Sequence, residues 1–380
     1  MCMAGSSPHF DDAERLAALR LARGKGIGPI LYGRLIARFG LPSRALEALP
    51  DLAARAQAKV SAAATGVVER EMAALRGRGG RLLVRGEADY PVALDSLADA
   101  PAVLSILGNP DMLARDCIAI VGARNASLAG RQLAQTYGRD LAAKGYAVVS
   151  GLARGIDTAA HSAALDAGAG GGGTIAVMAG GLDQIYPREN ETLFEAIAGG
   201  GGAVISEMAL GTAPTARHFP RRNRIVSGLS QGVVVVEAAV KSGSLITARL
   251  AAEQGREVFA VPGSPLDQRC RGSNGLIRDG AWLIETSDDI VANLPQMASW
   301  PVRSGTAVKT EPKQPEFSQK IQLDGAGDEV VALLSSGPTP VDEILRQCQT
   351  SPAMVAGVLL ELELAGRLER HPGNAVSLIV

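Results

Sequence analysis

The central part of the chain alternates short apolar runs with longer amphipathic stretches. The runs are CIAIVG, AVVSG, GTIAVM, AVISE, GVVVVE and EVFAVPG, between Cys117 and Gly263. Runs of this length and composition predict strands that are buried on both faces. Ser127 can cap a helix that Gly145 ends, and Asp157 can cap the next helix. The alternation predicts an α/β fold with a Rossmann-like, mainly parallel sheet.

Different patterns flank this region. Residues 12–75 show helical spacing of apolar residues on both sides of GKGIGP. The Gly26 and Gly28 turn looks like a helix-hairpin-helix, although these glycines could simply make a tight turn. Near the other end, three helical patterns and two short strands predict a winged helix. Its third helix carries Glu361 and Glu363 and no Lys or Arg, which favours contact with protein over contact with DNA.

These patterns predict four segments in a chain of 380 residues, a length that one hydrophobic core rarely supports. Residues 1–85 form a helical domain of the helix-hairpin-helix or SAM-like type, and residues 86–292 form the Rossmann-like domain. Residues 293–325 combine several prolines with polar residues and are expected to be a linker. Residues 326–380 form the winged helix.

Composition and charge exclude several classes of protein. The formal net charge is -1, so a nucleic-acid site must be a local cluster of cations. The four cysteines are widely separated, which argues against a zinc cluster and a disulfide framework. The sequence shows neither a signal peptide pattern nor a long apolar run. We therefore expect a cytoplasmic protein with no metal and no membrane contact.

The candidate site follows from the strand pattern, because ligands of open parallel sheets bind beyond the carboxyl ends of the strands. Helix N-termini, glycine turns and cations gather at those positions and suit phosphates. In chain order the expected DNA-binding residues are Gly122, Arg124, Ser127, Gly151, Arg154, Gly180, Gly181, Phe219, Arg221, Arg222, Asn223, Arg224, Lys241, Ser242, Gly243, Ser244 and Thr247.

The strongest electrostatic feature is the segment between Met208 and Val236. It contains four arginines, including Arg217, and neither Asp nor Glu. Such a segment in a nearly neutral chain indicates a polyanionic partner. Taken one at a time, these residues have simpler interpretations, such as turn geometry for a glycine or a solvated charge for an arginine. His161 stands one turn after Asp157, yet no third ligand accompanies the pair, which favours a packing role.

Five motifs together resemble the DNA processing protein A (DprA/Smf) family. They are IAIVGARNAS, VVSGLARGIDTAAH, IAVMAGGLDQIYPREN, FPRRNRIVSGLS and VVVVEAAVKSGSLITA, and they run in order through the central domain. The N-terminal helical module and the C-terminal winged helix resemble the family in their type of fold more than in particular sequence motifs.

The resemblance implies a protein that binds single-stranded DNA, forms a homodimer through its Rossmann-like domain and loads RecA recombinase in natural transformation and recombination. It implies a phosphate pocket and a base-stacking role for Phe219. No cofactor is expected, because GARNAS replaces the dinucleotide motif G-x-G-x-x-G after the first strand.

Two alternatives stay open. Related Rossmann-like domains resemble nucleotide-binding phosphoribohydrolases, but the P-G-G-x-G-T motif of those enzymes is absent. Glu207 and Glu237 end predicted strands without an evident second acid or base, so we expect no enzymatic activity. The other alternative is an adaptor whose central pocket holds only a free nucleotide.

Overall fold

The structure is a computed structural model that describes residues 9–167, 171–295 and 330–379, except 336, 349 and 372. Its residues fall into two compact units. One unit contains Asp12–Ala64 and the described C-terminal residues, and the other contains residues 9–11 and 65–295. The expected linker lies outside the described residues from residue 296 onward. Among the described residues, no helix is both long and apolar enough to cross a membrane.

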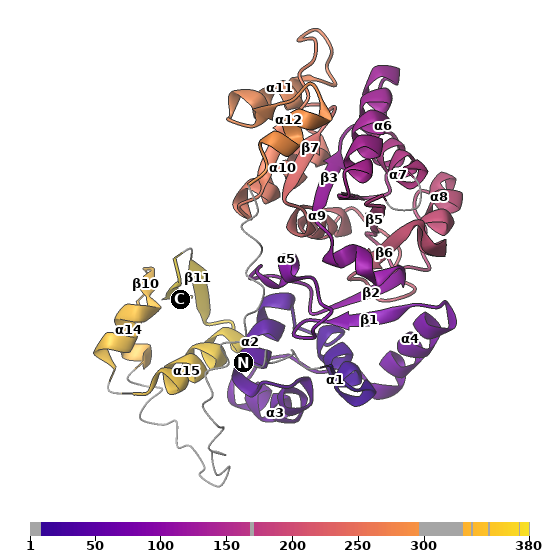
Figure 1. Cartoon of the computed structure of the whole chain (residues 1–380). Coiled ribbons are helices and arrows are strands. Elements are labelled where there is room, and N and C mark those ends of the chain that lie inside the picture. The colour runs from indigo at the N-terminus through magenta and orange to yellow at the C-terminus, as the bar shows by residue number, and fades with distance from the viewer. Residues whose placement is uncertain are drawn as a thin grey trace, which may run out of the picture. The chain divides into compact units, whose positions relative to one another are not determined.

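The larger unit is built on a nine-stranded sheet in the order β1-β2-β6-β5-β4-β3-β7-β8-β9 (Figure 1). From β6 to β9 all neighbours are parallel, and β1 and β2 add an antiparallel edge. The mainly parallel sheet predicted from the apolar runs is therefore confirmed. The strands are β1 (Arg81–Val84), β2 (Val103–Gly108), β3 (Cys117–Val121), β4 (Ala147–Ser150), β5 (Thr174–Val177), β6 (Gly202–Ser206), β7 (Gly232–Val235), β8 (Glu257–Ala260) and β9 (Trp282–Leu283).

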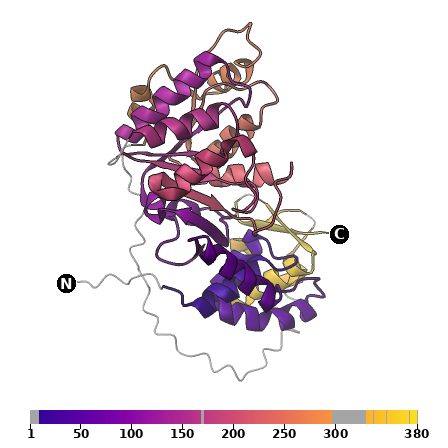
Figure 2. The ribbon, with the colours of Figure 1, turned by 90° about the vertical axis from the view of Figure 1, so that its right-hand side faces the viewer.

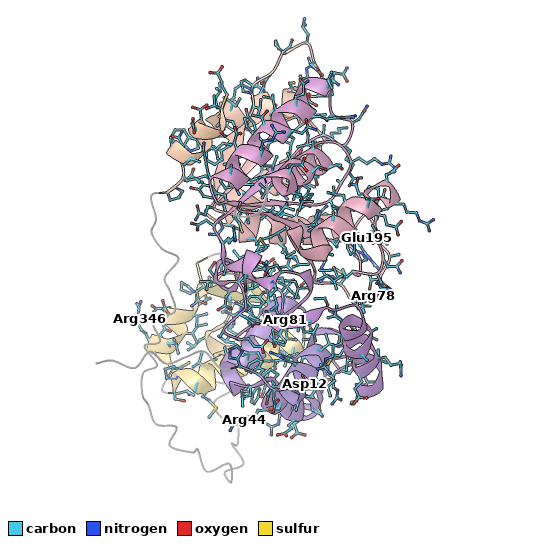
Figure 3. All side chains as sticks on the ribbon, turned by 45° about the vertical axis from the view of Figure 1, so that its right-hand side comes forward. Asp12, Arg44, Arg78, Arg81, Glu195 and Arg346 are labelled. Atoms are coloured by element: carbon cyan, nitrogen blue, oxygen red, sulfur yellow. The ribbon has the colours of Figure 1, made fainter. Side chains whose placement is uncertain are left out.

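The sheet begins earlier than the sequence pattern suggested. We expected the central domain to start at residue 86, but β1 pairs with β2 along its whole length. Arg81 opens this strand, directly after the turn that contains Arg78 (Figure 3). The pattern missed β1 because four residues with one polar end give too little periodicity to identify a strand.

Helices cover both faces of the sheet because alternate strand residues point to opposite sides. Ile118 and Ile120 of β3 pack in the core under one layer of helices, whereas Ala119 and Val121 pack under the other. The first layer is formed by α6 (Leu128–Ala143), α7 (Ile156–Asp166) and α12 (Ser287–Ala292). The second contains α5 (Val92–Asp95), α9 (His218–Leu229) and α10 (Gly243–Glu253). The remaining helical segments of this unit are α4 (Thr65–Gly77), η1 (Pro110–Ala114), η2 (Arg188–Asn190), α8 (Glu191–Ala196), η3 (Ile197–Gly201) and α11 (Arg271–Arg278).

The strand order places a topological switch point between β3 and β7. From β3 the chain moves outward through β4, β5 and β6, and it then returns to place β7 on the other side of β3. The loops after β3 and β7 therefore leave the sheet toward different helix layers. This geometry opens the carboxyl edge of the sheet, where ligands of such folds bind.

The smaller unit contains two modules whose types agree with the sequence patterns. Its helices α1 (Asp12–Ala22), α2 (Pro29–Phe39) and α3 (Pro42–Arg55) follow one another with short turns. The winged helix is described by α14 (Val341–Gln347), α15 (Pro352–Leu364) and a small sheet of β10 (Thr339–Pro340), β12 (Ala375–Leu378) and β11 (Leu368–His371). The wing therefore has a third short strand, β10, beyond the two that we expected.

Close packing of α6 against α7 fixes the framework of the site (Figures 1 and 2). A Cβ added at Gly138 of α6 would lie 2.6 Å from the carbonyl oxygen of Ala160 of α7. No side chain fits at that distance without separating the helices.

We therefore expect Gly138→Ala to lower the free energy of unfolding by about 1–3 kcal/mol, although alanine is the better helix former. Denaturant titration measures the change. Gly275→Ala in α11 is the matched control, because a Cβ there would meet only Arg278 Nη2, at 3.9 Å. If both variants have the same free energy of unfolding, the close contact between α6 and α7 does not constrain the packing of these helices.

Candidate nucleic-acid interface

A pocket of about 670 Å³ lies at the carboxyl ends of β3, β4 and β5. Its walls come from the loops after these strands, from the first turns of α6 and α7, and from the start of α9. Four of the predicted residues, Arg124, Gly151, Arg154 and Phe219, line it together. We call this cavity the strand-end pocket.

An arginine and two aromatic rings form one wall of the strand-end pocket. The guanidinium carbon of Arg124 lies 4.9 Å from the centroid of the Phe219 ring, in a cation–π contact. Tyr186 packs edge to face against Phe219, with the ring centroids 6.2 Å apart. Arg124 is exposed and forms no ion pair with any described residue. This wall therefore offers an uncompensated cation beside aromatic surface.

The pocket lining also includes a paired arginine. Arg154 donates from Nη2 to Glu189 at 2.8 Å and from Nε to the same carboxylate at 2.9 Å. Both side chains are about 60% exposed, so the pair contributes little to stability. Its geometry nevertheless directs the Arg154 guanidinium along the pocket wall, where an incoming phosphate could compete with Glu189.

Behind Gly151 of the pocket lining lies a buried guanidinium, that of Arg222, which the sequence pattern had assigned to DNA. Arg222 is 6% exposed and donates to the carbonyl oxygen of Val177 at 3.0 Å. Burial lowers its pKa to about 10, and the nearby charge of Asp157 opposes that shift. A Cβ at Gly151 would overlap the Arg222 guanidinium, so only glycine leaves room for this side chain. The geometry gives Arg222 a structural role beneath the pocket.

Asp157 ties the loop after β4 to α7, but it is not the cap that we expected. The N-cap residue is Gly155, and the helix begins at Ile156. The Asp157 carboxylate instead accepts the backbone N–H groups of Gly151 at 3.1 Å and Ala153 at 3.3 Å. Burial raises its pKa, while Arg222 and these amides oppose the rise.

His161 has the packing role that the sequence favoured. Its Nε2 accepts from the Leu152 amide at 3.3 Å, so Nδ1 carries the proton and donates to the Thr174 hydroxyl at 2.7 Å. Thr174 in turn donates to the carbonyl oxygen of Val148. Burial lowers the pKa of His161 to about 3, which keeps the ring neutral.

The N-terminus of α6 is filled by an internal anion. Glu237, after β7, accepts the Ser127 amide at 2.9 Å and also accepts the Ser127 hydroxyl. The same hydroxyl accepts from Gly130 and thereby caps α6, as predicted. Gly122 packs against Ile156 in the same region. The helix end expected to hold a phosphate therefore holds a carboxylate of the protein, and Ser127 has no donor left for DNA.

A second arginine of α9 is also buried and paired inside the protein. Arg224 is 6% exposed, forms an ion pair with Glu207 at 2.6 Å and donates to the backbone of Asp99. Arg221 is half exposed and lies 3.7 Å from the other oxygen of Glu207. The Arg217–Arg224 segment is thus less available than its composition suggested, because acids outside the segment neutralise part of it.

The remaining predicted residues lie outside the strand-end pocket. Gly180 and Gly181 pack against the backbone of residues 209–214. Asn223 donates to the carbonyl oxygen of Gly243 at 3.3 Å. Lys241 and Gly243 are exposed at the N-terminus of α10, where Ser242 is the cap. Ser244 and Thr247 are buried.

Sequence reasoning missed most of the residues that line the pocket, both in the loops and on the helix faces behind them. The missed lining residues include Asn125, Arg131, Gln135, Ser162, Tyr186 and Asn190. Arg131 and Gln135 stand four residues apart on α6, a spacing that places them on one face and could have been recognised. Tyr186 gave no periodic signal.

The ion pair between Arg224 and Glu207 predicts that removing the Arg224 side chain lowers the stability of the fold. Replacing Arg224 by Ala removes the nearer and better buried of the two arginines that pair with Glu207, which should lower the free energy of unfolding by about 3 kcal/mol. Denaturant titration tests this, with the exposed Arg217→Ala as the control that should change it by less than about 0.5 kcal/mol. Equal stabilities for the two variants would show that the pair is not structural.

His161 predicts a dependence of stability on pH. Its pKa falls from 6.5 to about 3 on folding, so the unfolded chain takes up the proton first as the pH drops. This group's contribution is complete above pH 6.5 and should fall by about 2 kcal/mol between pH 7.5 and pH 5. His161→Gln should remove that part of the slope in denaturant titrations at the two pH values. A variant with the same slope as the parent chain would contradict the assignment.

Comparisons with known proteins agree with the architecture. A family model described as DNA recombination-mediator protein A matches residues 81–295. Models for a DprA-like N-terminal HHH domain and a DprA winged helix domain match residues 12–74 and 312–374. The chain is 40% identical to Protein Smf of Escherichia coli, over 76% of this chain and 75% of that protein. It is 45% identical to DNA processing protein DprA of Bacillus subtilis, over 60% and 75%.

Two solved structures share the fold. The X-ray structure of DprA from Streptococcus pneumoniae aligns with a TM-score of 0.63 and 32% identity, covering 76% of this chain and all of that one. A structure from Helicobacter pylori, whose description concerns the single-stranded DNA binding mode of DprA, aligns with a TM-score of 0.51 and 32% identity, over 56% and 94%. The family model matches more than half of the residues of this chain. Together with these likenesses, it shows that the chain belongs to the DNA recombination-mediator protein A family, the DprA/Smf proteins.

Proposed function

We propose that the chain binds single-stranded DNA in the strand-end pocket. The observation that carries the proposal is the wall in which an exposed, unneutralised Arg124 stacks over Phe219, with Tyr186 beside it. The relative from Helicobacter pylori, whose description names single-stranded DNA, supports the same ligand class.

The chemistry of this wall suits an unpaired strand. Guanidinium groups bind phosphates, and aromatic rings offer stacking surfaces to bases whose faces are free. In a duplex those faces are covered by neighbouring base pairs, so aromatic residues inside a pocket favour single strands. Because phosphate contacts and stacking carry little sequence information, we expect weak base preference.

The N-terminus of α10 extends the proposed surface. Lys241 is exposed there, and the Gly243 position has open space around it. Backbone amides at a helix start and an ammonium group together attract phosphates. Lys241, Ser242 and Gly243 therefore stay in the proposed interface, whereas the buried Arg222, Arg224, Ser244 and Thr247 act by supporting it.

The broader role rests on the family. We propose that the protein acts in the cytoplasm, in natural transformation and recombination, as a homodimer that passes single strands to RecA recombinase. The resemblance of the central motifs and the names of the DNA-processing relatives support this role. A binding function also fits the two strand-end carboxylates considered for catalysis, because Glu207 and Glu237 are both held by internal partners.

Arg124→Ala tests the site. It should weaken binding of an oligothymidylate about five- to tenfold and lower the salt slope by about 0.7, as expected when one phosphate of a single strand no longer meets a cation. Fluorescence anisotropy at several salt concentrations measures both quantities. Arg139→Ala is the matched control, an exposed arginine of α6 outside the pocket. Should the two variants bind alike, the strand-end pocket is not the DNA site.

A further inference from the structure

The strand-end pocket does not stop at the ends of the strands. Its lining continues along α6 through Arg131 and Gln135 and along α7 through Thr158, Ala159 and Ser162. On α6 the close contact between the two helices comes at Gly138, three residues beyond Gln135, where the helix meets the backbone of Ala160. The cavity therefore has an extension between the first turns of α6 and α7, which we call the α6–α7 groove.

Arg131 is the charged residue of this groove. It is exposed and forms no ion pair with a residue that the structure describes. It lies in the first helical turn after Leu128, and side chains on a helix lean toward its N-terminus. Arg131 and Arg124 line the same pocket, which agrees with that direction. Gln135, one turn farther on, adds an amide on the same face of α6.

The facing side of α7 is narrow and polar. Ala159 is buried and small, and the hydroxyl-bearing Thr158 and Ser162 flank it at four-residue spacing. Thr158 already donates to the carbonyl oxygen of Ala153, which leaves Ser162 as the hydroxyl of this side that can turn to a ligand. Carboxylates are absent from the five residues that line the groove. A cation, an amide and a hydroxyl around a slot of this kind suit the phosphate and sugar of a nucleotide.

We propose that the α6–α7 groove binds the next nucleotide of a single strand whose preceding part lies on Arg124 and Phe219, with Arg131 on its phosphate. This inference rests on the proposed function and adds to it a direction for the strand, away from the sheet and between the two helices. Arg131 therefore increases the affinity for longer oligonucleotides, because a ligand confined to the strand ends does not reach it.

The test compares Arg131→Ala with Arg139→Ala in the full chain, using oligothymidylates of increasing length. Arg139 lies on the same helix two turns farther on, outside the pocket. Arg131→Ala should weaken binding of the longer oligonucleotides roughly fivefold and lower their salt slope by about 0.7. It should leave the shortest bound oligonucleotides unchanged, whereas Arg124→Ala should weaken binding at every length.

A second variant tests the groove without changing charge. Ser162→Leu places a branched apolar side chain on the facing wall, and it should weaken binding of the same longer oligonucleotides about as much as Arg131→Ala. If Arg131→Ala matches Arg139→Ala at every length while Arg124→Ala still weakens binding, the groove assignment is wrong and the pocket assignment survives. If Arg124→Ala has no effect either, both assignments are wrong.

Discussion

The buried guanidinium of Arg222 connects the parts of the site that come from distant points in the chain. It reaches from α9 to the carbonyl oxygen at the end of β5, lies against Gly151 at the end of β4 and faces the carboxylate of Asp157 on α7. Burying a cation costs free energy unless hydrogen bonds and an opposite charge compensate it. Because the accepting carbonyl lies at the end of β5 and the opposite charge lies on α7, the compensation requires that these two elements keep their positions relative to α9.

The pocket above this guanidinium depends on the same arrangement. Asp157 also holds the amides of the loop after β4, and that loop carries Arg154 along the pocket wall. On the other side, Glu237 fastens the start of α6, the helix that carries Arg131. Buried acids thus fix the loop after β4 and the start of α6, and the exposed Arg131 on α6 has no described ion-pair partner. A preorganised cationic pocket loses less conformational entropy when it binds a flexible strand.

Much of the fold could be predicted from the sequence, because six buried parallel strands give unbroken apolar runs such as CIAIVG and GVVVVE. The site was harder to predict, since composition shows charge but not burial. Arg222 and Arg224 look as available as Arg124 in the sequence, yet they turn inward to Asp157 and Glu207. Ser127 was predicted correctly as a cap but not as a partner of Glu237, because that contact joins residues far apart in the chain. Arg131 was missed because its place in the pocket depends on which face of α6 lies beside α7.

The most direct measurement of the central claim is a structure of the protein bound to an oligothymidylate. We predict a base against Phe219 and phosphates on Arg124 and then Arg131, with Arg222 and Arg224 still facing their internal partners. A strand bound on another surface, with the strand-end pocket empty, would contradict it.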